Sequence, residues 1–352
     1  MPYSVVDKGS KYFNTVLYTG TGATQSITGV GFQPDWVWIK GRSGATDHGL
    51  YDAVRGIQKQ LESNTTTAET TETTGLTAFG TDGFTVGALA QLNTSSATYV
   101  AWNWLGANTT VSNTSGTISS TVSANTTSGF SIVSYTGNGT SGATVGHGLG
   151  VAPKMVIGRR RATIEDWIVN HTLASATAGS YLKLNTTNAV ISGNAVVWNN
   201  TNPSSTVFTL GTDTSLNGNG STYIAYCFAE VKGYSKFGSY TGNGSTDGTF
   251  IYTGFKPAWI MVKETGNVNS WRMLDNKRSP INVMNKPLFA NLNNAEGTAD
   301  HETDFVSNGF KIRSSDTNMN RSGGTYIYMA FAENPFTSSK GIPTTARWSG
   351  LS

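Results

Sequence analysis

The sequence predicts an all-β protein made of three tandem β-sandwich or jelly-roll-like repeats with short loop helices. Three landmarks recur in the same order: a Tyr-Thr-Gly-x-Gly turn, an apolar strand that follows a proline, and an aromatic closing strand. The closing strands open on Tyr99, Tyr223 and Tyr326, which lie 124 and 103 residues apart along the chain. A period of this length is that of a domain, whereas solenoid repeats are far shorter.

The positions of the landmarks define the repeats. The turn lies at residues 18–22, 135–139 and 240–244, the central strand at residues 31–40, 150–159 and 254–263, and the closing strand at residues 98–104, 222–228 and 325–331. Composition favours the same fold class, because 41 glycines and many Ser, Thr and Asn residues suit turns and strands. Aromatic residues make up 11% of the chain and its net charge is only +3, which argues against disorder.

The central strand has two apolar faces. Trp36 and Trp38 point to one side of a strand and Val37 and Ile39 to the other. We therefore expect this strand to lie inside a two-layer packing. A cation ends the strand in each repeat, and we expect it to extend into water. These cations are Lys40, Arg159 and Lys263.

The segments after each central strand differ most between the repeats. Residues 51–61 are compatible with a helix, while residues 166–171 and 271–278 are the corresponding stretches of the other two repeats. Asp82-Gly83 and Asn308-Gly309 are hairpin signals, because these residues tolerate positive φ. Variable loops on a constant scaffold are where partner contacts are usually placed.

The predicted domain boundaries follow from the landmarks. Residues 1–107, 129–231 and 235–335 form the three repeats, residues 108–128 a Ser/Thr/Asn-rich linker, and residues 336–352 a C-terminal tail that packs on a neighbouring domain or chain. A flexible linker and an extended edge strand both fit residues 108–128. The alternation of Val111, Ile118 and Val122 favours a partly ordered, extended segment.

Several functional classes are excluded or disfavoured. Charged residues are only 13% of the chain, so we expect no nucleic-acid partner. No apolar run reaches the length of a membrane span and no signal peptide is recognisable, so no membrane insertion is expected. Cys227 cannot form an intrachain disulfide and is expected to be a small buried hydrophobe.

Cofactor and metal sites are not indicated. The four histidines lack metal-ligand spacing, and His147 is expected to serve a glycine-rich loop. Asp213 and Asp316 offer oxygens to Ca²⁺ but form no EF-hand loop. We therefore predict no cofactor and no metal.

A glycan depolymerase would need two carboxylates. The candidate pairs are Asp47 with Asp52, Glu165 with Asp166, and Asp300 with Asp304. None of these pairs recurs in all three repeats, and there is no Gly-x-Ser-x-Gly elbow. Surface solvation of these acids is the better interpretation, and we predict that the chain is not an enzyme.

Aromatic and basic residues are the candidates for surface contact. The tryptophans of the repeated strands are expected in the core, whereas Trp167, Trp198 and Trp271 lie in or near variable segments and are expected to be exposed. Arg159, Arg160 and Arg161 form a basic run, which is usually a solvated strand end. Such a run also binds an acidic neighbour or a phosphate.

Three segments carry a resemblance to a known group of proteins. Residues 12–20, 29–40 and 134–154 resemble repeated-domain virion structural proteins of marine tailed bacteriophages, including cyanophages. The resemblance covers nearly the whole chain and implies a structural place in the particle, often with tail-fibre or receptor-binding labels. It brings no catalytic residues with it.

The expected function is therefore that of a bacteriophage virion structural protein. The first hypothesis is a tail-fibre, tail-tip or receptor-binding component that contacts the host surface; the alternatives are a capsid decoration protein and a tail-associated glycan depolymerase. The expected partners are other virion proteins, further copies of the chain in a homo-oligomer, and a host surface glycan or receptor. The expected location is the tail or capsid surface of a virion assembled in the host cytoplasm.

Overall fold

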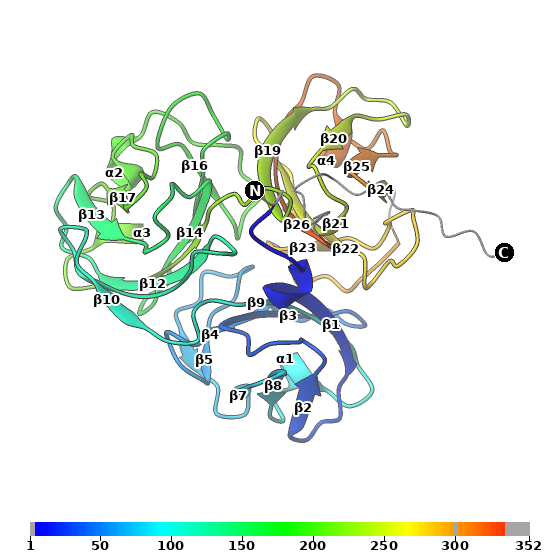
Figure 1. The fold of residues 1–352 in the computed structure, drawn as a ribbon, viewed down its shortest axis with the longest axis horizontal. Coiled ribbons are helices and arrows are strands. Elements are labelled where there is room, and N and C mark those ends of the chain that lie inside the picture. Colours follow the sequence, from blue (N-terminus) through cyan, green and yellow to red (C-terminus); the bar gives the residue numbers. More distant parts are fainter. Residues whose placement is uncertain (1–3, 299–301, 335–352) are drawn as a thin grey trace.

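The computed structural model describes residues 4–298 and 302–334 and has an all-β architecture, as predicted. Three lobes surround a common centre (Figure 1), and each is built on one antiparallel main sheet. Lobe 1 comprises residues 13–104, lobe 2 residues 111–228, and lobe 3 residues 235–332. The predicted tail at residues 336–352 lies outside the described residues, as do Asp300 and His301.

Lobe 1 contains a four-stranded main sheet and a smaller outer sheet. The main sheet has the order β1 (Phe13–Thr19), β9 (Thr98–Trp104), β3 (Trp36–Gly41) and β4 (Gly49–Asp52). The outer sheet has the order β2 (Gln25–Thr28), β8 (Gly83–Val86) and β7 (Leu76–Gly80), and β5 (Lys59–Gln60) pairs with β6 (Thr70–Thr71). Strands β7 and β8 form the hairpin that Asp82-Gly83 predicted.

Lobe 2 has the largest sheet. Its order is β10 (Val111–Asn113), β11 (Ser120–Asn125), β12 (Phe130–Thr136), β18 (Thr222–Phe228), β14 (Met155–Arg160), β15 (Ile168–His171) and β16 (Tyr181–Lys183). The outer pair is β13 (Ala143–Gly146) with β17 (Val207–Leu210). Because β10 and β11 belong to this sheet, residues 108–128 contain two paired strands rather than a flexible linker.

Lobe 3 repeats the strand order of lobe 1. Its main sheet has the order β19 (Ser235–Thr241), β26 (Thr325–Ala332), β21 (Pro257–Glu264), β22 (Arg272–Asp275) and β23 (Leu288–Phe289). The outer sheet has the order β20 (Phe250–Tyr252), β25 (Gly309–Ile312) and β24 (Thr303–Val306). Strands β24 and β25 form the hairpin expected at Asn308-Gly309. In every main sheet the closing strand therefore lies between the central strand and the strand that ends in the Tyr-Thr-Gly-x-Gly motif, namely β1, β12 or β19.

The helices are short and lie in loops, as predicted, but one expected position is wrong. They are η1 (Gly9–Lys11), α1 (Ala90–Asn93), α2 (Ala195–Trp198), α3 (Thr214–Asn217) and α4 (Thr317–Asn320). Residues 51–61, which the sequence allowed as a helix, form the end of β4, a turn and β5. Gly56 and Gln58 have φ values of +94° and +65°, which interrupt any helical run.

The Tyr-Thr-Gly-x-Gly turns attach β1, β12 and β19 to the closing strands of their lobes. In lobe 1 Tyr18 stacks on Tyr99 at 5.0 Å between ring centroids, and its hydroxyl donates to the Leu92 carbonyl at 2.7 Å. A Cβ on Gly20 would lie 2.2 Å from the Thr94 carbonyl oxygen, so only glycine fits there. The corresponding tyrosine pairs are Tyr135 with Tyr223 at 5.1 Å and Tyr240 with Tyr326 at 4.8 Å. The recurring motif is therefore structural.

The central strands have the two apolar faces that the sequence predicted. Val37 and Ile39 pack inside lobe 1, whereas Trp36 and Trp38 belong to a core shared by all three lobes. Ring centroids within this shared core join lobes 1 and 2 (Trp36–Tyr226, 4.2 Å), lobes 1 and 3 (Trp104–Trp259, 5.8 Å), and lobes 2 and 3 (Phe228–Phe331, 6.2 Å). Aromatic burial on this scale contributes strongly to stability, so the lobes form one body.

Candidate functional site: the interfaces between the lobes

The three tryptophans predicted to be exposed are buried, so that prediction is wrong. The exposed fractions of Trp167, Trp198 and Trp271 are 0%, 1% and 1%. Trp198 packs in the core of lobe 2, with its ring 6.0 Å from that of Phe208. Trp167 and Trp271 lie at lobe interfaces and belong to the shared core. None of the three side chains is available to stack on a sugar.

Trp167 and Trp271 share a structural position with His48. Each residue directly precedes the strand that pairs with the central strand of its lobe. Its side-chain N–H donates to a main-chain carbonyl of a neighbouring lobe. The pairs are His48 Nε2 with Phe289 O at 3.0 Å, Trp167 Nε1 with Glu62 O at 2.7 Å, and Trp271 Nε1 with Lys183 O at 2.9 Å. Lobe 1 therefore donates to lobe 3, lobe 2 to lobe 1, and lobe 3 to lobe 2, which closes a ring.

Local hydrogen bonds hold these donors in place. An asparagine side chain accepts the main-chain N–H of each donor residue. The pairs are His48 with Asn64 at 3.0 Å, Trp167 with Asn185 at 2.9 Å, and Trp271 with Asn291 at 2.9 Å. The same asparagine contact therefore supports each of the three hydrogen bonds between lobes.

A cluster of buried ion pairs lies at the interface between lobes 1 and 2. Asp52 and Arg55 form an ion pair with no exposed side-chain surface, and Arg55 also contacts Glu69 at 3.1 Å. From lobe 2, the Tyr226 hydroxyl donates to Asp52 at 2.8 Å, and Arg161 binds Glu69 through two bonds of 2.9 and 2.8 Å. Burial lowers the pKa of Arg55, but the negative charges of Asp52 and Glu69 raise it by more, so the net shift of this pKa is upward.

A second cluster of the same design lies between lobes 3 and 1. Asp275 and Arg278 form an ion pair with no exposed side-chain surface, and Arg278 contacts Glu296 at 3.3 Å. From lobe 1, Trp102 Nε1 donates to Asp275 at 3.1 Å, and Arg42 binds Glu296 through bonds of 2.9 and 2.8 Å. Neither cluster was predicted from the sequence. The available signal was an Asp-x-x-Arg sequence that begins at the last residue of β4 and of β22.

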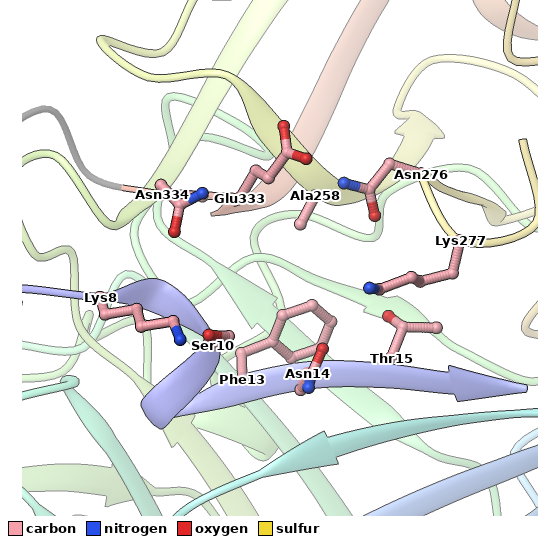
Figure 2. Close-up of a pocket in the computed structure, with 11 residues that line it drawn as sticks. Lys8, Ser10, Phe13, Asn14, Thr15, Ala258, Asn276, Lys277, Glu333 and Asn334 are labelled. Carbon is pink, nitrogen blue, oxygen red and sulfur yellow. The ribbon is translucent and has the colours of Figure 1, made fainter. Parts of the chain in front are cut away.

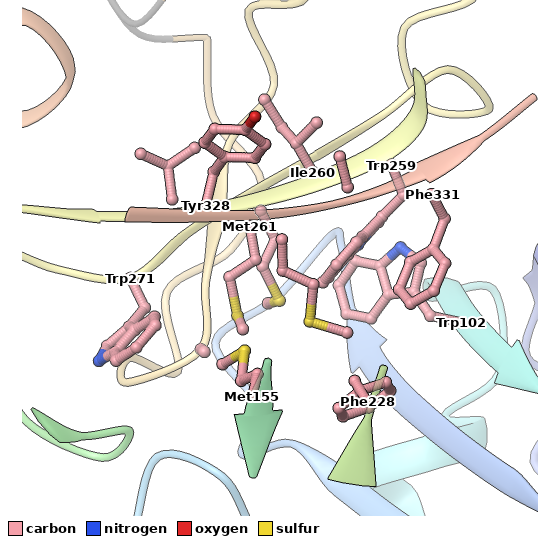
Figure 3. Close-up of a cluster of buried hydrophobic side chains, with 14 of the residues drawn as sticks. Trp102, Met155, Phe228, Trp259, Ile260, Met261, Trp271, Tyr328 and Phe331 are labelled. Atoms are coloured by element: carbon pink, nitrogen blue, oxygen red, sulfur yellow. The ribbon is translucent and has the colours of Figure 1, made fainter. Parts of the chain in front are cut away.

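The interface between lobes 2 and 3 has a different chemistry. His171 occupies the position of Asp52 and Asp275, and Met329 the position of Tyr226 and Trp102. A thioether donates no hydrogen bond, so an acid here would lack its cross-lobe donor. Figure 3 shows Met155 of lobe 2 facing Met261 and Trp271 of lobe 3, in a contact rich in methionine. Flexible methionine side chains fill this irregular space.

The cations at the ends of the central strands do not extend into water, so that prediction is also wrong. Lys40, Arg159 and Lys263 are fully buried. Arg159 Nη2 donates to the carbonyls of Thr66 and Thr67 in lobe 1, both at 2.7 Å. Burial lowers the pKa of Arg159 to about 10 and the pKa of each lysine to about 8.

Arg160 and Arg161, the other two residues of the basic run, make intramolecular contacts. Arg160 Nη2 donates to the Ser221 hydroxyl at 2.8 Å, and Arg161 binds Glu69. The interpretation of the run as a solvated strand end is therefore wrong for Arg159, which is buried, whereas Arg160 and Arg161 are partly exposed. The alternative, that the run grips an acidic neighbour, is correct for Arg161.

In each carboxylate pair considered for a depolymerase, at least one carboxylate contacts another side chain of the protein. Asp52 pairs with Arg55, and Asp47 accepts from Asn64 at 2.6 Å. Asp166 pairs with Lys183 at 2.6 Å. Asp304 lies 3.5 Å from Arg313. Within residues 4–298 and 302–334, no cluster of three or more His, Cys, Asp or Glu side chains is arranged to hold a metal ion.

An open hollow lies between lobes 1 and 3 and has a volume of about 190 Å³. Figure 2 shows Lys277 reaching from lobe 3 toward Thr15 on β1, with Lys8 on the other side. Glu333 also lines the hollow but pairs with Lys256 at 2.9 Å. The described residues that line the hollow supply hydrogen-bonding groups but no pair of carboxylates for acid and base catalysis.

The buried histidines make stability depend on pH. His171 Nδ1 accepts the Leu173 N–H at 3.2 Å, so the ring is neutral and Nε2 donates to the Tyr328 carbonyl. Burial lowers the pKa of His171 to about 4 and that of His48 to about 3. Between these values and the ordinary pKa of about 6.5, the unfolded chain binds more protons, so stability falls as pH falls. Asp35 acts in the opposite direction, because burial raises its pKa to about 6.

We expect His171→Asn to remove part of this pH dependence. The asparagine oxygen can still accept the Leu173 N–H, as the Asp275 carboxylate accepts the Lys277 N–H at 3.1 Å at the corresponding position. The His171 contribution, on the order of 3 kcal/mol, should therefore disappear between pH 6.5 and pH 4. Urea unfolding at four pH values would measure it. An unchanged difference between variant and parent across this range would contradict the assignment.

These observations define an all-β protein whose three antiparallel main sheets share one aromatic core closed by buried ion clusters. Residues 8–335 match the family described as a domain of unknown function (DUF7483), and the chain belongs to this family. The matched range contains all three main sheets. A search of curated proteins found none that matches the sequence. No helix in the described part of the chain is long and apolar enough to cross a membrane.

Proposed function

We propose that the chain is a structural protein of a tailed-bacteriophage virion, built from three tandem β-sandwich repeats, and that it contacts the host surface from the tail. The observation that carries this proposal is that tryptophan, aspartate and arginine side chains, which could otherwise bind a sugar or act in catalysis, make contacts between the lobes. Trp167, Trp271 and both Asp-x-x-Arg pairs hold the lobes together rather than line a reaction site. The matched strand orders and the ring of cross-lobe hydrogen bonds support the repeat origin of the lobes.

The surface loops are the proposed contact elements in place of the buried tryptophans. Ile164 lies in the loop between β14 and β15, and Val268 in the corresponding loop between β21 and β22. Their exposed fractions are 76% and 70%. Ile281, in the loop after β22, is 80% exposed. Exposed apolar side chains on loops of a rigid scaffold are suited to binding a glycan or protein receptor.

Cryo-electron microscopy of intact particles that carry this chain tests the proposal. Density for the three-lobed body on the tail, in a small symmetric multiple, is the expected result. Copies spread over the capsid lattice would favour a decoration protein. Absence of the chain from the particle would overturn the structural role altogether.

The contact role predicts a loss of adsorption when the loops lose their apolar side chains. We expect particles with Ile164→Ser and Val268→Ser to bind host cells at least about tenfold more weakly, because burying each apolar side chain contributes about 1.5–3 kcal/mol. Leu17→Ser is the matched control, since Leu17 is 40% exposed but lies on β1 rather than on a loop. Equal adsorption of the loop variant and the control would contradict the contact role.

A further inference from the structure

The hollow between lobes 1 and 3 contains a threonine where the other two interfaces have larger apolar residues. Thr15 on β1 pairs with Trp102 of the closing strand, and the residues in the same register of lobes 2 and 3 are Ile132 and Phe237. Both Ile132 and Phe237 are buried in the shared core. Because threonine is smaller than either residue, it leaves space at the interface between lobes 1 and 3.

A lysine on the other side of the hollow also replaces an apolar residue. Lys277 lies two residues after the end of β22, and the residues at the same place after β4 and β15 are Val54 and Leu173. Lys277 reaches from lobe 3 toward Thr15 (Figure 2). Of the three interfaces between lobes, only this one therefore combines a hydroxyl with an ammonium group at these two positions.

Three polar groups at the hollow have no partner within the described part of the chain. Thr15 is 4% exposed, and its hydroxyl makes no hydrogen bond. A buried hydroxyl without a partner costs about 1–3 kcal/mol, which a bound ligand would offset. Lys8 and Lys277 are exposed, and neither ammonium group pairs with another described residue. The carboxylate of Glu333, which also lines the hollow, is already paired with Lys256 at 2.9 Å.

The donors and acceptors around the hollow indicate what kind of ligand it fits. The ammonium groups of Lys8 and Lys277 only donate hydrogen bonds, and their charges attract an anion. The Thr15 hydroxyl and the side-chain amides of Asn276 and Asn334 both donate and accept, as the hydroxyls of a sugar do. An inorganic phosphate offers mainly acceptors and would leave the amide oxygens unmatched. A sugar that carries a carboxylate meets both requirements.

The volume of the hollow, about 190 Å³, limits the size of the ligand. One water molecule takes up about 30 Å³ in the liquid, so the hollow has room for about six waters or one sugar residue. We propose that this hollow binds the carboxylate-bearing sugar residue of an acidic glycan, with Lys8 and Lys277 attracting the carboxylate and Thr15 bonded to a sugar hydroxyl. The biological source of the glycan rests on the host contact proposed above, whereas binding by the purified chain does not.

Titration of the purified full chain with two matched sugars, followed by saturation-transfer NMR, tests the proposal. Methyl β-glucuronide should bind with a Kd on the order of 1 mM at low salt, and added salt should weaken the binding because it screens the exposed lysines. Methyl β-glucoside lacks only the carboxylate and should bind at least about tenfold more weakly. Equal binding of the two sugars would overturn the proposal, as would tighter binding of inorganic phosphate than of the glucuronide.

Variants place the binding at this hollow. Lys277→Gln should weaken glucuronide binding about tenfold, whereas Lys154→Gln, which removes an exposed lysine of lobe 2, should leave it unchanged. Thr15→Ile gives lobe 1 the residue that lobe 2 has in this register and should abolish binding by filling the hollow. Equal effects of the two lysine variants, or undiminished binding by a folded Thr15→Ile chain, would overturn the proposal. Neither result would alter the proposed place of the chain on the tail.

Discussion

Replacing Arg55 with methionine is expected to lower the free energy of unfolding by about 3–5 kcal/mol, because it leaves a buried carboxylate without its cation. Arg55 donates to Asp52, to the carbonyls of Leu50 and Lys59 at 2.8 and 3.0 Å, and to Glu69 at 3.1 Å. Its side chain and that of Asp52 have no exposed surface. Water therefore cannot replace the lost bonds without opening the interface between lobes 1 and 2.

Equilibrium unfolding in urea measures this loss, and two comparisons make it specific. Adding Asp52→Asn to Arg55→Met should restore part of the stability, since the uncompensated charge is then removed. Lys11→Met should have no measurable effect, because the Lys11–Asp7 pair is exposed to water. An Arg55→Met effect no larger than that of Lys11→Met would show that the buried cluster does not hold the interface.

Replacing Trp36 with alanine is expected to cost about 3–5 kcal/mol and to uncouple the lobes. The indole lies 4.2 Å from the ring of Tyr226 and 5.9 Å from that of Phe130, both in lobe 2, and 4.5 Å from Trp104 in its own lobe. We therefore expect unfolding monitored by tryptophan fluorescence and by far-ultraviolet circular dichroism to give separate transitions in the variant and coincident transitions in the parent chain.

Trp198→Ala is the matched control for this prediction. Trp198 is as buried as Trp36, but it packs only within the core of lobe 2. Its removal should lower stability by a similar amount. We expect no separation of the transitions, because the contacts between lobes remain. Coincident transitions in Trp36→Ala, with a loss below about 1.5 kcal/mol, would show that the shared core does not couple the lobes.

Two interfaces between lobes contain buried ions and the third contains methionine, because the facing side chains differ in their hydrogen-bond donors. Tyr226 and Trp102 each offer an N–H or O–H to the aspartate of the neighbouring lobe. Met329 occupies the same position of lobe 3 and has no such donor. His171 Nδ1 accepts the Leu173 N–H of its own lobe, and His171 Nε2 donates to the Tyr328 carbonyl of lobe 3. The residues on the two sides of each interface are therefore matched in their hydrogen-bonding capacity.

The sequence by itself determined the all-β class, the two apolar faces of the central strand, the hairpins and the burial of Cys227. These features depend on local patterns, namely the two-residue period of a strand and the residues that a turn requires. These features do not depend on which neighbouring lobe a strand packs against.

Only the tertiary structure decided what the loops and cations face. Trp167 and Trp271 lie in or next to segments that differ between the lobes, and Arg159 lies at the end of a central strand. Both places look exposed to solvent when one lobe is considered alone. The exposed fraction of each residue is set by a neighbouring lobe that lies roughly one hundred residues away in the sequence. No local pattern records that three lobes close around one core, so their contacts became visible only in the assembled fold.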